Sequence, residues 1–211
     1  MYNDFAETFS ASRTDHPWPE IDYIITRIQK MGTVRILDIG CGNGRFLEEA
    51  EKQGLTLEHY QGIDTSEKMI EEARRMHPRH AFRVIDMRDL EGLHEVYDGI
   101  LCIASFHHLE TATERMMVLD AFRHLLTPHG VIFMTNWNLR EQEKYRDSYQ
   151  GNGDYEVKIG PYSRYYHGFT VDELDRLFRV NDYTIMENRV FDGGKNIVSI
   201  LSLEKSENPK V

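Results

Sequence analysis

A segment with glycine at every second position most constrains how this chain can fold. Residues 38–44 read Asp-Ile-Gly-Cys-Gly-Asn-Gly, directly after a short apolar run and directly before a helical pattern that begins at Arg45. Glycine adopts backbone conformations that other residues avoid, so such a segment can turn tightly and approach a ligand closely. A strand, a glycine-rich turn and a helix place that ligand at the carboxyl end of the strand. The segment therefore predicts a ligand-binding turn, with a purely structural turn as the alternative.

The size and composition of the chain favour a single soluble domain. Its 211 residues suffice for one hydrophobic core, and the formal net charge of -10 argues against a non-specific nucleic-acid binder while allowing a local basic patch. Cys41 and Cys102 are the only cysteines, which excludes a disulfide framework and a four-cysteine zinc site. No apolar stretch reaches membrane-spanning length and no signal peptide is visible. We therefore expect a cytoplasmic protein with no membrane contact and no metal.

Downstream of the glycine turn, helix and strand patterns alternate. The last two expected strands flank Asp192-Gly-Gly, which is a hairpin turn signal. This alternation predicts an α/β fold, namely a doubly wound, Rossmann-like sheet of about seven strands, mostly parallel, with one antiparallel strand near an edge. The expected helices cover residues 44–53, 67–76, 111–126 and 170–179, and the expected strands cover 36–39, 55–63, 81–85, 97–104, 131–135, 182–191 and 195–204.

Two segments stand outside this alternation. Residues 1–31 space their apolar side chains as helices do and predict an N-terminal helical cap, which would at least cover a sheet edge. Residues 137–168 are rich in Tyr, Gly, Asn, Lys and Arg and show little periodicity. A loop of this length in a compact domain is usually functional or disordered, and its aromatic and cationic residues favour a function. We expect one domain over residues 1–211, in which 137–168 is a substrate-binding insertion.

Acidic residues follow two of the predicted strands. Asp64 lies 20 residues after Gly44, at a strand end where a carboxylate can accept hydrogen bonds from both hydroxyls of a ribose. The alternative for Asp64 is a helix cap, but Ser66 is already placed for that role. Asp86 and Met87 follow the next strand and suit an adenine, the acid for its exocyclic amine and the methionine for its face.

Together these motifs resemble those of the class I S-adenosylmethionine-dependent methyltransferases. The glycine spacing departs from the dinucleotide-binding fingerprint, which has two residues before its third glycine. It is similar to the first motif of that methyltransferase family, in which the loop carries the methionine part of the cofactor. The match covers roughly residues 34–136 and implies S-adenosyl-L-methionine as cofactor and S-adenosyl-L-homocysteine as product. The cofactor-binding positions that it implies are Arg13, Asp38, Gly40, Cys41, Gly42, Gly44, Asp64, Thr65, Asp86, Met87 and Ile103.

A narrower resemblance covers most of the chain. It is to the tRNA wobble-uridine methyltransferases, which methylate the carboxylate of 5-carboxymethyl-type uridines at the first anticodon position. The segment Arg-Tyr-Tyr-His is the most specific part, because nothing in the general fold requires it. The motifs that carry the resemblance are Tyr2-Asn-Asp-Phe-Ala6, Phe9-Ser-Ala-Ser-Arg13, Trp18-Pro19, His107-His108-Leu109 and Arg164-Tyr165-Tyr166-His167. The resemblance implies two partners, the tRNA anticodon loop and a small zinc-binding activator protein that some relatives use.

Methyl transfer from a sulfonium to a carboxylate needs positioning more than acid–base chemistry. A carboxylic acid with an ordinary pKa near 4 is already ionised at neutral pH, so a general base is dispensable. The site then needs donors that orient the carboxylate, and an arginine can grip it through two N–H groups. Our candidates are Arg13, His107, Arg164 and His167, with Arg13 the better choice for the carboxylate of the cofactor itself. His107 and Arg164 are the predicted catalytic pair.

Aromatic residues of the two outer segments are candidates for binding the acceptor. Trp18, Tyr165 and Tyr166, together with His167, are the predicted substrate-binding residues. Rings of this kind stack on the splayed-out bases of single-stranded RNA, although packing in a core or lid is an equal alternative.

Two other functions remain open from the sequence. A small-molecule carboxyl, hydroxyl or amine methyltransferase suits the acidic balance and the single domain, and a hydroxyl or amine acceptor would make His107 the natural general base. A non-catalytic cofactor-binding subunit is the third possibility. It would bind the cofactor without methylating any tRNA.

Overall fold

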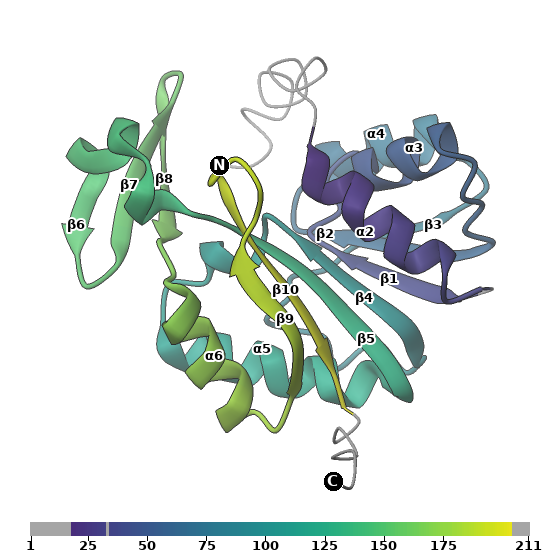
Figure 1. Ribbon diagram of the computed structural model, residues 1–211. Coiled ribbons are helices and arrows are strands. Elements are labelled where there is room, and N and C mark those ends of the chain that lie inside the picture. The colour runs from purple at the N-terminus through teal and green to yellow at the C-terminus, as the bar shows by residue number, and fades with distance from the viewer. Residues whose placement is uncertain (1–17, 33, 204–211) are drawn as a thin grey trace, which may run out of the picture.

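A seven-stranded sheet forms the centre of the molecule in the computed structural model, which describes residues 18–32 and 34–203 (Figure 1). The strands run in the order β3-β2-β1-β4-β5-β10-β9. β1 pairs in parallel with β2 and β4, β2 with β3, and β4 with β5, whereas β10 pairs antiparallel with both β5 and β9. The predicted sheet is therefore confirmed. The strands are β1 (Arg35–Ile39), β2 (His59–Asp64), β3 (Ala81–Val84), β4 (Tyr97–Ile103), β5 (Leu126–Trp137), β9 (Thr184–Val190) and β10 (Asn196–Ser202).

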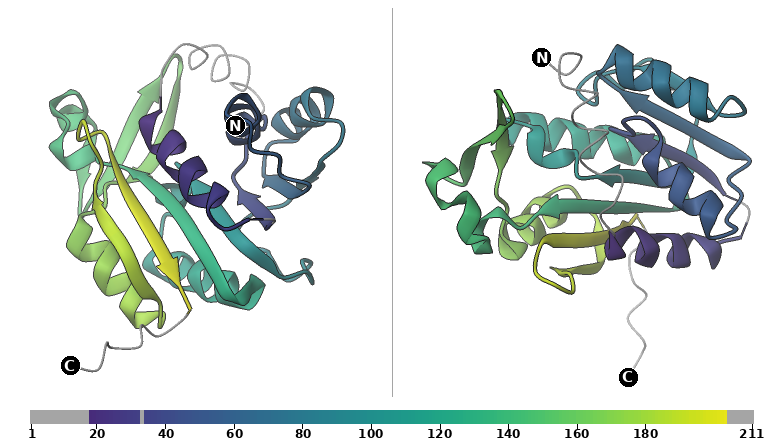
Figure 2. Two further views of the ribbon diagram at one scale, coloured as in Figure 1. Left: turned by 45° about the vertical axis from the view of Figure 1, so that its right-hand side comes forward. Right: turned by 90° about the horizontal axis from the view of Figure 1, so that it is seen from above.

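Helices cover both faces of the sheet, and each face has its own hydrophobic core (Figures 1 and 2). Successive side chains of a strand point to opposite faces, so Ile36 joins one core while its neighbour Leu37 joins the other. In β5, Phe133 likewise packs into the first of these cores and Met134 into the other. The first core contains residues of α2 (Pro19–Gln29), α3 (Arg45–Lys52) and α4 (Glu67–Met76), and the second contains residues of α5 (Ala112–Leu125) and α6 (Val171–Val180).

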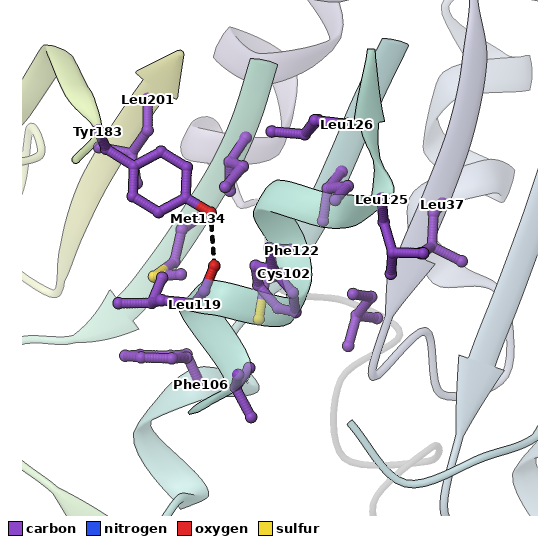
Figure 3. Packing of buried hydrophobic residues seen from close by; sticks show 14 of the residues in the cluster. Leu37, Cys102, Phe106, Leu119, Phe122, Leu125, Leu126, Met134, Tyr183 and Leu201 are labelled. Atoms are coloured by element: carbon purple, nitrogen blue, oxygen red, sulfur yellow. Dashed lines mark hydrogen bonds between the residues drawn. The ribbon is translucent and has the colours of Figure 1, made fainter. Parts of the chain in front are cut away.

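The second core closes around the C-terminal strands (Figure 3). Tyr183, which precedes β9, is 5% exposed, and its hydroxyl donates a hydrogen bond of 2.6 Å to the carbonyl oxygen of Leu119 in α5. Burying this phenol is tolerable because its polar end has a partner. The contact fixes the edge of the sheet to the helix that follows the candidate site.

Several expected boundaries need correction. The second strand begins at His59 rather than near Leu55, because Leu55 and Leu57 are buried in the approach to the sheet without pairing in it. The fifth strand runs from Leu126 to Trp137, well beyond the expected 131–135, and its pairing with β4 shifts register between Tyr97 and Gly99. The first predicted helix of the N-terminal cap lies outside the described residues.

The expected loop over residues 137–168 is in fact structured. After the short 3-10 helices η2 (Leu139–Glu141) and η3 (Glu143–Ser148), it forms a separate three-stranded antiparallel sheet, seen at the upper left of Figure 1. Its strands are β6 (Tyr149–Gly151), β7 (Asp154–Ile159) and β8 (Tyr162–His167). Tyr155 and Val157 face a small core while Glu156 between them is exposed. This alternation was the available signal for a strand.

Candidate active site

The glycine turn between β1 and α3 adopts backbone angles that require glycine. Gly40, Gly42 and Gly44 have φ angles of 76°, 57° and 87°, in the left-handed region. A Cβ on Gly40 would also overlap the hydroxyl of Ser105, at the end of β4, and lie 2.6 Å from the Ser105 Cβ. The first glycine is therefore fixed by its backbone angle and by the close approach of β4, whereas nothing lies within 4 Å of a Cβ on Gly42.

A cavity of about 410 Å³ opens at the carboxyl ends of the parallel strands, beside this turn. Its position is the one at which doubly wound sheets bind ligands. Most of the predicted cofactor-binding residues line it, whereas Gly44 is the N-cap of α3 beside His77 and Arg13 lies outside the described residues. The residues of that prediction that line the cavity are Asp38, Gly40, Cys41, Gly42, Asp64, Thr65, Asp86, Met87 and Ile103.

Asp64 fastens the glycine turn to the end of β2. One carboxylate oxygen accepts a hydrogen bond of 3.0 Å from the backbone N–H of Gly42, and the other accepts one of 2.9 Å from Ser66. Ser66 caps α4 through its own hydroxyl, as predicted. Burial raises the pKa of Asp64 and these backbone hydrogen bonds oppose that shift. Each carboxylate oxygen has a second lone pair, so ribose binding stays our prediction for Asp64.

Asp38 lies deeper, behind the turn. Only 2% of the residue is exposed, and the hydroxyl of Tyr60 donates a hydrogen bond of 2.7 Å to its carboxylate. Burial raises the pKa of Asp38 to about 7, because a charge is poorly solvated there, and the hydrogen bond from Tyr60 opposes the shift. The carboxyl group that begins the glycine motif thus titrates close to neutral pH.

Arg88 holds the acid that is predicted to meet adenine. Its guanidinium lies 3.0 Å and 2.6 Å from the two carboxylate oxygens of Asp86, and it also pairs with Glu114 at 3.1 Å. These hydrogen bonds lower the pKa of Asp86, which keeps the carboxylate ionised and fixed in orientation. Arg88 lines the cavity as well. The sequence prediction missed Arg88, although an arginine two residues after a candidate site acid was a usable signal.

Three further residues bring cationic and aromatic groups to the same cavity. Trp18, Arg45 and Arg164 all line it, and the Arg45 guanidinium lies 4.4 Å above the centre of the Trp18 ring. Burial lowers the pKa of Arg164 to about 10, which leaves it charged at neutral pH. Arg45 was also missed. The sequence feature that could have revealed Arg45 was its place in the first turn of the predicted helix, where the helix dipole disfavours a cation.

The two adjacent histidines occupy different environments, and the one that lines the cavity is not the predicted one. His107 is fully buried, and its Nδ1 accepts a hydrogen bond of 3.2 Å from the backbone N–H of Trp137. His108 lines the cavity instead. Both belong to the 3-10 helix η1 (Phe106–His108), in which consecutive side chains point about 120° apart. The sequence gives no means of choosing between them without that geometry.

The predicted substrate-binding residues of β8 make contacts that hold the small sheet in place, and they are not among the residues that line the cavity. Tyr166 is 1% exposed, so its ring has no open face for an RNA base. The hydroxyl of Tyr165 donates to Asp154 at 2.6 Å and accepts from Arg115 at 3.0 Å. The two ring nitrogens of His167 lie 2.9 Å and 2.6 Å from carboxylate oxygens of Asp154 and Glu173.

Two features that other functions would require are not found in the described parts of the chain. No group of three or more His, Cys, Asp or Glu side chains there could hold a metal ion. Within residues 18–32 and 34–203, no helix is long and apolar enough to cross a bilayer.

Comparison with known proteins points to one enzyme class. A family profile described as a methyltransferase domain matches residues 36–130. The tRNA (carboxymethyluridine(34)-5-O)-methyltransferase of Saccharomyces cerevisiae is 31% identical over 152 residues, which are 72% of this chain and 51% of that protein. The ubiquinone biosynthesis O-methyltransferase of Xylella fastidiosa is 30% identical over 125 residues, 56% of this chain and 47% of that protein. This chain thus spans about half the length of both curated relatives.

A solved structure shares the fold over nearly the whole chain. It is an S-adenosylmethionine-dependent methyltransferase from Clostridium acetobutylicum, which superimposes with a TM-score of 0.72 and 16% sequence identity over 97% of this chain and 99% of that chain. The strand order, the cavity beside the glycine turn and the sequence match to a methyltransferase domain are all consistent with this fold. The chain therefore matches the methyltransferase domain model over residues 36–130 and shares the fold of a solved S-adenosylmethionine-dependent methyltransferase.

Proposed function

We propose that this chain transfers the methyl group of S-adenosylmethionine to the carboxylate of a 5-carboxymethyl-type uridine at the wobble position of tRNA. In this reaction a carboxylate oxygen attacks the methyl carbon. The bond from that carbon to sulfur breaks with its electron pair moving to sulfur, and the products are a methyl ester and S-adenosylhomocysteine. The similarity to the yeast enzyme supports the tRNA acceptor.

One observation carries the choice of a carboxylate acceptor. Arg164, which comes from the insertion, lines the same cavity as Asp64 and Asp86, the residues proposed for the cofactor. A guanidinium can hold a carboxylate through two parallel hydrogen bonds and leave a lone pair for attack. The acceptor is ionised at neutral pH, so the site needs no general base for this reaction. The work of the protein is then to align the oxygen, the methyl carbon and the sulfur.

The roles of individual residues follow from their places in the cavity. The glycine turn and Asp64 would hold the methionine and ribose parts of the cofactor, and Asp86 with Met87 its adenine. Arg164 would orient the acceptor carboxylate, and Trp18 would form part of the entrance wall. The described residues hold nothing that supports a zinc-binding activator protein as a partner.

A small-molecule acceptor is the second candidate, favoured by the match to the ubiquinone biosynthesis enzyme. A hydroxyl acceptor needs a base, and His108 is the histidine that reaches the cavity.

Methyl-labelled cofactor distinguishes the candidates. The purified chain is incubated with tRNA that carries 5-carboxymethyluridine, with the same tRNA lacking that modification, and with a metabolite extract. Label in the modified tRNA alone supports the proposal, whereas label in a metabolite and none in either tRNA overturns it. Cofactor binding without transfer to any of the three would instead indicate a non-catalytic subunit.

A further inference from the structure

Three aromatic rings and two cations form a continuous stack in the insertion, here called the aromatic ladder. Arg164 lies 5.6 Å from the centre of the Tyr166 ring, and Tyr166 stacks on Trp137 at 4.9 Å with an angle of 16° between the rings. Trp137 stacks in turn on Tyr145 at 6.0 Å and 21°. The amino group of Lys144 lies 4.6 Å from the centre of the Tyr145 ring. The ladder therefore begins at the cavity and ends at Lys144.

The ladder is assembled by the tertiary fold from three separate elements. Trp137 ends β5, Tyr145 lies in η3, and Tyr166 lies in β8. Exposure increases along it, from the buried Tyr166 through the half-buried Trp137 and Tyr145 to the exposed Lys144. Rings that only filled a core would not need to be stacked nearly parallel from a cavity to the surface.

The outer end of the ladder has the chemistry of a single-stranded nucleic-acid site. The side chain of Lys144 covers Tyr145 from an exposed position, where its flexible stem can move aside at little cost. Aromatic faces bind nucleobases by stacking, and a nearby lysine can then pair with the phosphate. Arg146 of the same short helix is already paired with Glu143 at 2.6 Å, so Lys144 is the better placed of the two cations.

We propose that the outer face of Tyr145 is a stacking site for the base of a nucleotide that flanks the methylated uridine, and that Lys144 contacts its phosphate. This inference rests on the proposed function and adds a second subsite to it. Arg164 at the inner end would hold the carboxylate of the target nucleotide, while Tyr145 at the outer end would hold its neighbour. The ladder between them would fix the spacing of the two.

The test compares Tyr145→Ala with Tyr145→Phe on an anticodon stem-loop that contains 5-carboxymethyluridine. Stacking is lost in the first variant and kept in the second. We expect Tyr145→Ala to raise KM about tenfold with kcat unchanged, as expected for loss of one base–aromatic stack. Tyr145→Phe should match the wild type. Tyr149→Ala is the matched control, since Tyr149 is an exposed tyrosine of the same insertion that packs on Tyr155.

A second substrate identifies the occupant. A stem-loop that is abasic at a nucleotide flanking the target should raise the KM of the wild type as Tyr145→Ala does, and combining the two changes should add nothing further. Independent, additive effects would overturn the stacking site. So would a fall in kcat with KM unchanged, which would show that Tyr145 only supports Arg164 through the ladder, or a Tyr145→Ala variant equal to the wild type. A wild type that is inactive on the stem-loop would overturn the proposed function itself.

Discussion

The Nδ1 atom of His108 lies 3.1 Å from the backbone carbonyl oxygen of Tyr165. A carbonyl can only accept, so the neutral imidazole carries its proton on Nδ1 and a lone pair on Nε2. This contact joins the turn after β4 to β8, next to Arg164. The position of the arginine that is proposed to meet the acceptor therefore depends on a histidine of η1, the 3-10 helix that follows β4.

Two substitutions of His108 test the roles of its two ring nitrogens one at a time. Asparagine places an N–H close to the former Nδ1 and can still donate to Tyr165, whereas glutamine places its amide near the former Nε2. If His108 acts by positioning β8, His108→Asn should retain most of the activity and His108→Gln should raise the acceptor KM about tenfold, the effect of one lost hydrogen bond. Steady-state kinetics with varied tRNA measures this. The reverse order would show that Nε2 contacts the acceptor.

Arg164 should act on the acceptor and leave the cofactor untouched. Loss of a charge-assisted, two-point contact costs about 2–3 kcal/mol, so Arg164→Gln should lower kcat/KM for tRNA roughly 30- to 150-fold. Arg164→Lys keeps the charge but loses the fork of donors, and should fall between that variant and the wild type. Calorimetric titration with S-adenosylhomocysteine provides the control. A large drop in affinity for that product would instead assign Arg164 to the cofactor.

Arg115 ties the insertion to the loop after β4, and its loss should destabilise the protein. It is 6% exposed and donates to the carbonyl of Leu109 at 3.0 Å and to the hydroxyl of Tyr165 at 3.0 Å. Arg115→Met leaves a buried carbonyl without its donor and should lower the free energy of unfolding by about 2–4 kcal/mol. Tyr165→Phe removes one hydroxyl and should lower it by about 1 kcal/mol. Urea unfolding would contradict this if the two variants ranked in the opposite order.

The close approach of Ser105 makes the first glycine of the turn the least replaceable. Gly40→Ala must strain both its backbone angle and its contact with Ser105, whereas Gly42→Ala strains only its backbone angle. We expect the first variant to lose clearly more stability, since overpacking typically costs a further ~1–3 kcal/mol. Adding Ser105→Gly should restore part of the loss in Gly40→Ala and none in Gly42→Ala. Equal losses without rescue would exclude the contact as the cause.

Burial of Asp38 should make stability depend on pH near neutrality. Its pKa is raised from 3.8 to about 7 in the folded protein, so the folded state holds the proton more tightly than the unfolded chain. The associated stability is fully present below pH 3.8 and is lost as the pH rises to about 7. Asp38→Asn cannot ionise, so the variant should gain stability relative to the wild type between pH 5 and pH 8, by about 1.4 kcal/mol per pKa unit crossed. The measurement is the free energy of unfolding of the cofactor-free wild type and variant at pH 5 and pH 8. An equal difference between the two proteins at both pH values would contradict the raised pKa of Asp38.

The sheet, and the meeting of Asp64 and Asp86 at one cavity, were predictable from sequence because they depend on local patterns. Asp64 and Asp86 could be placed because Asp64 ends β2 and Asp86 lies just beyond the end of β3, and parallel strands end at one edge of the sheet. The acceptor end depends on tertiary contacts. Choosing between His107 and His108 requires the rotation of a 3-10 turn, and the inward position of Arg164 beside the buried Tyr166 requires the docking of β8.

The most direct test of the central claim is the chemical stability of the transferred methyl group. The chain is given labelled S-adenosylmethionine and tRNA bearing 5-carboxymethyluridine, and the recovered tRNA is treated with mild alkali. Transfer to a carboxylate gives a methyl ester, so the label should leave the tRNA as methanol and the wobble nucleoside should return to its starting mass. Label that survives this treatment would place the methyl group on a nitrogen or a hydroxyl and would contradict the claim.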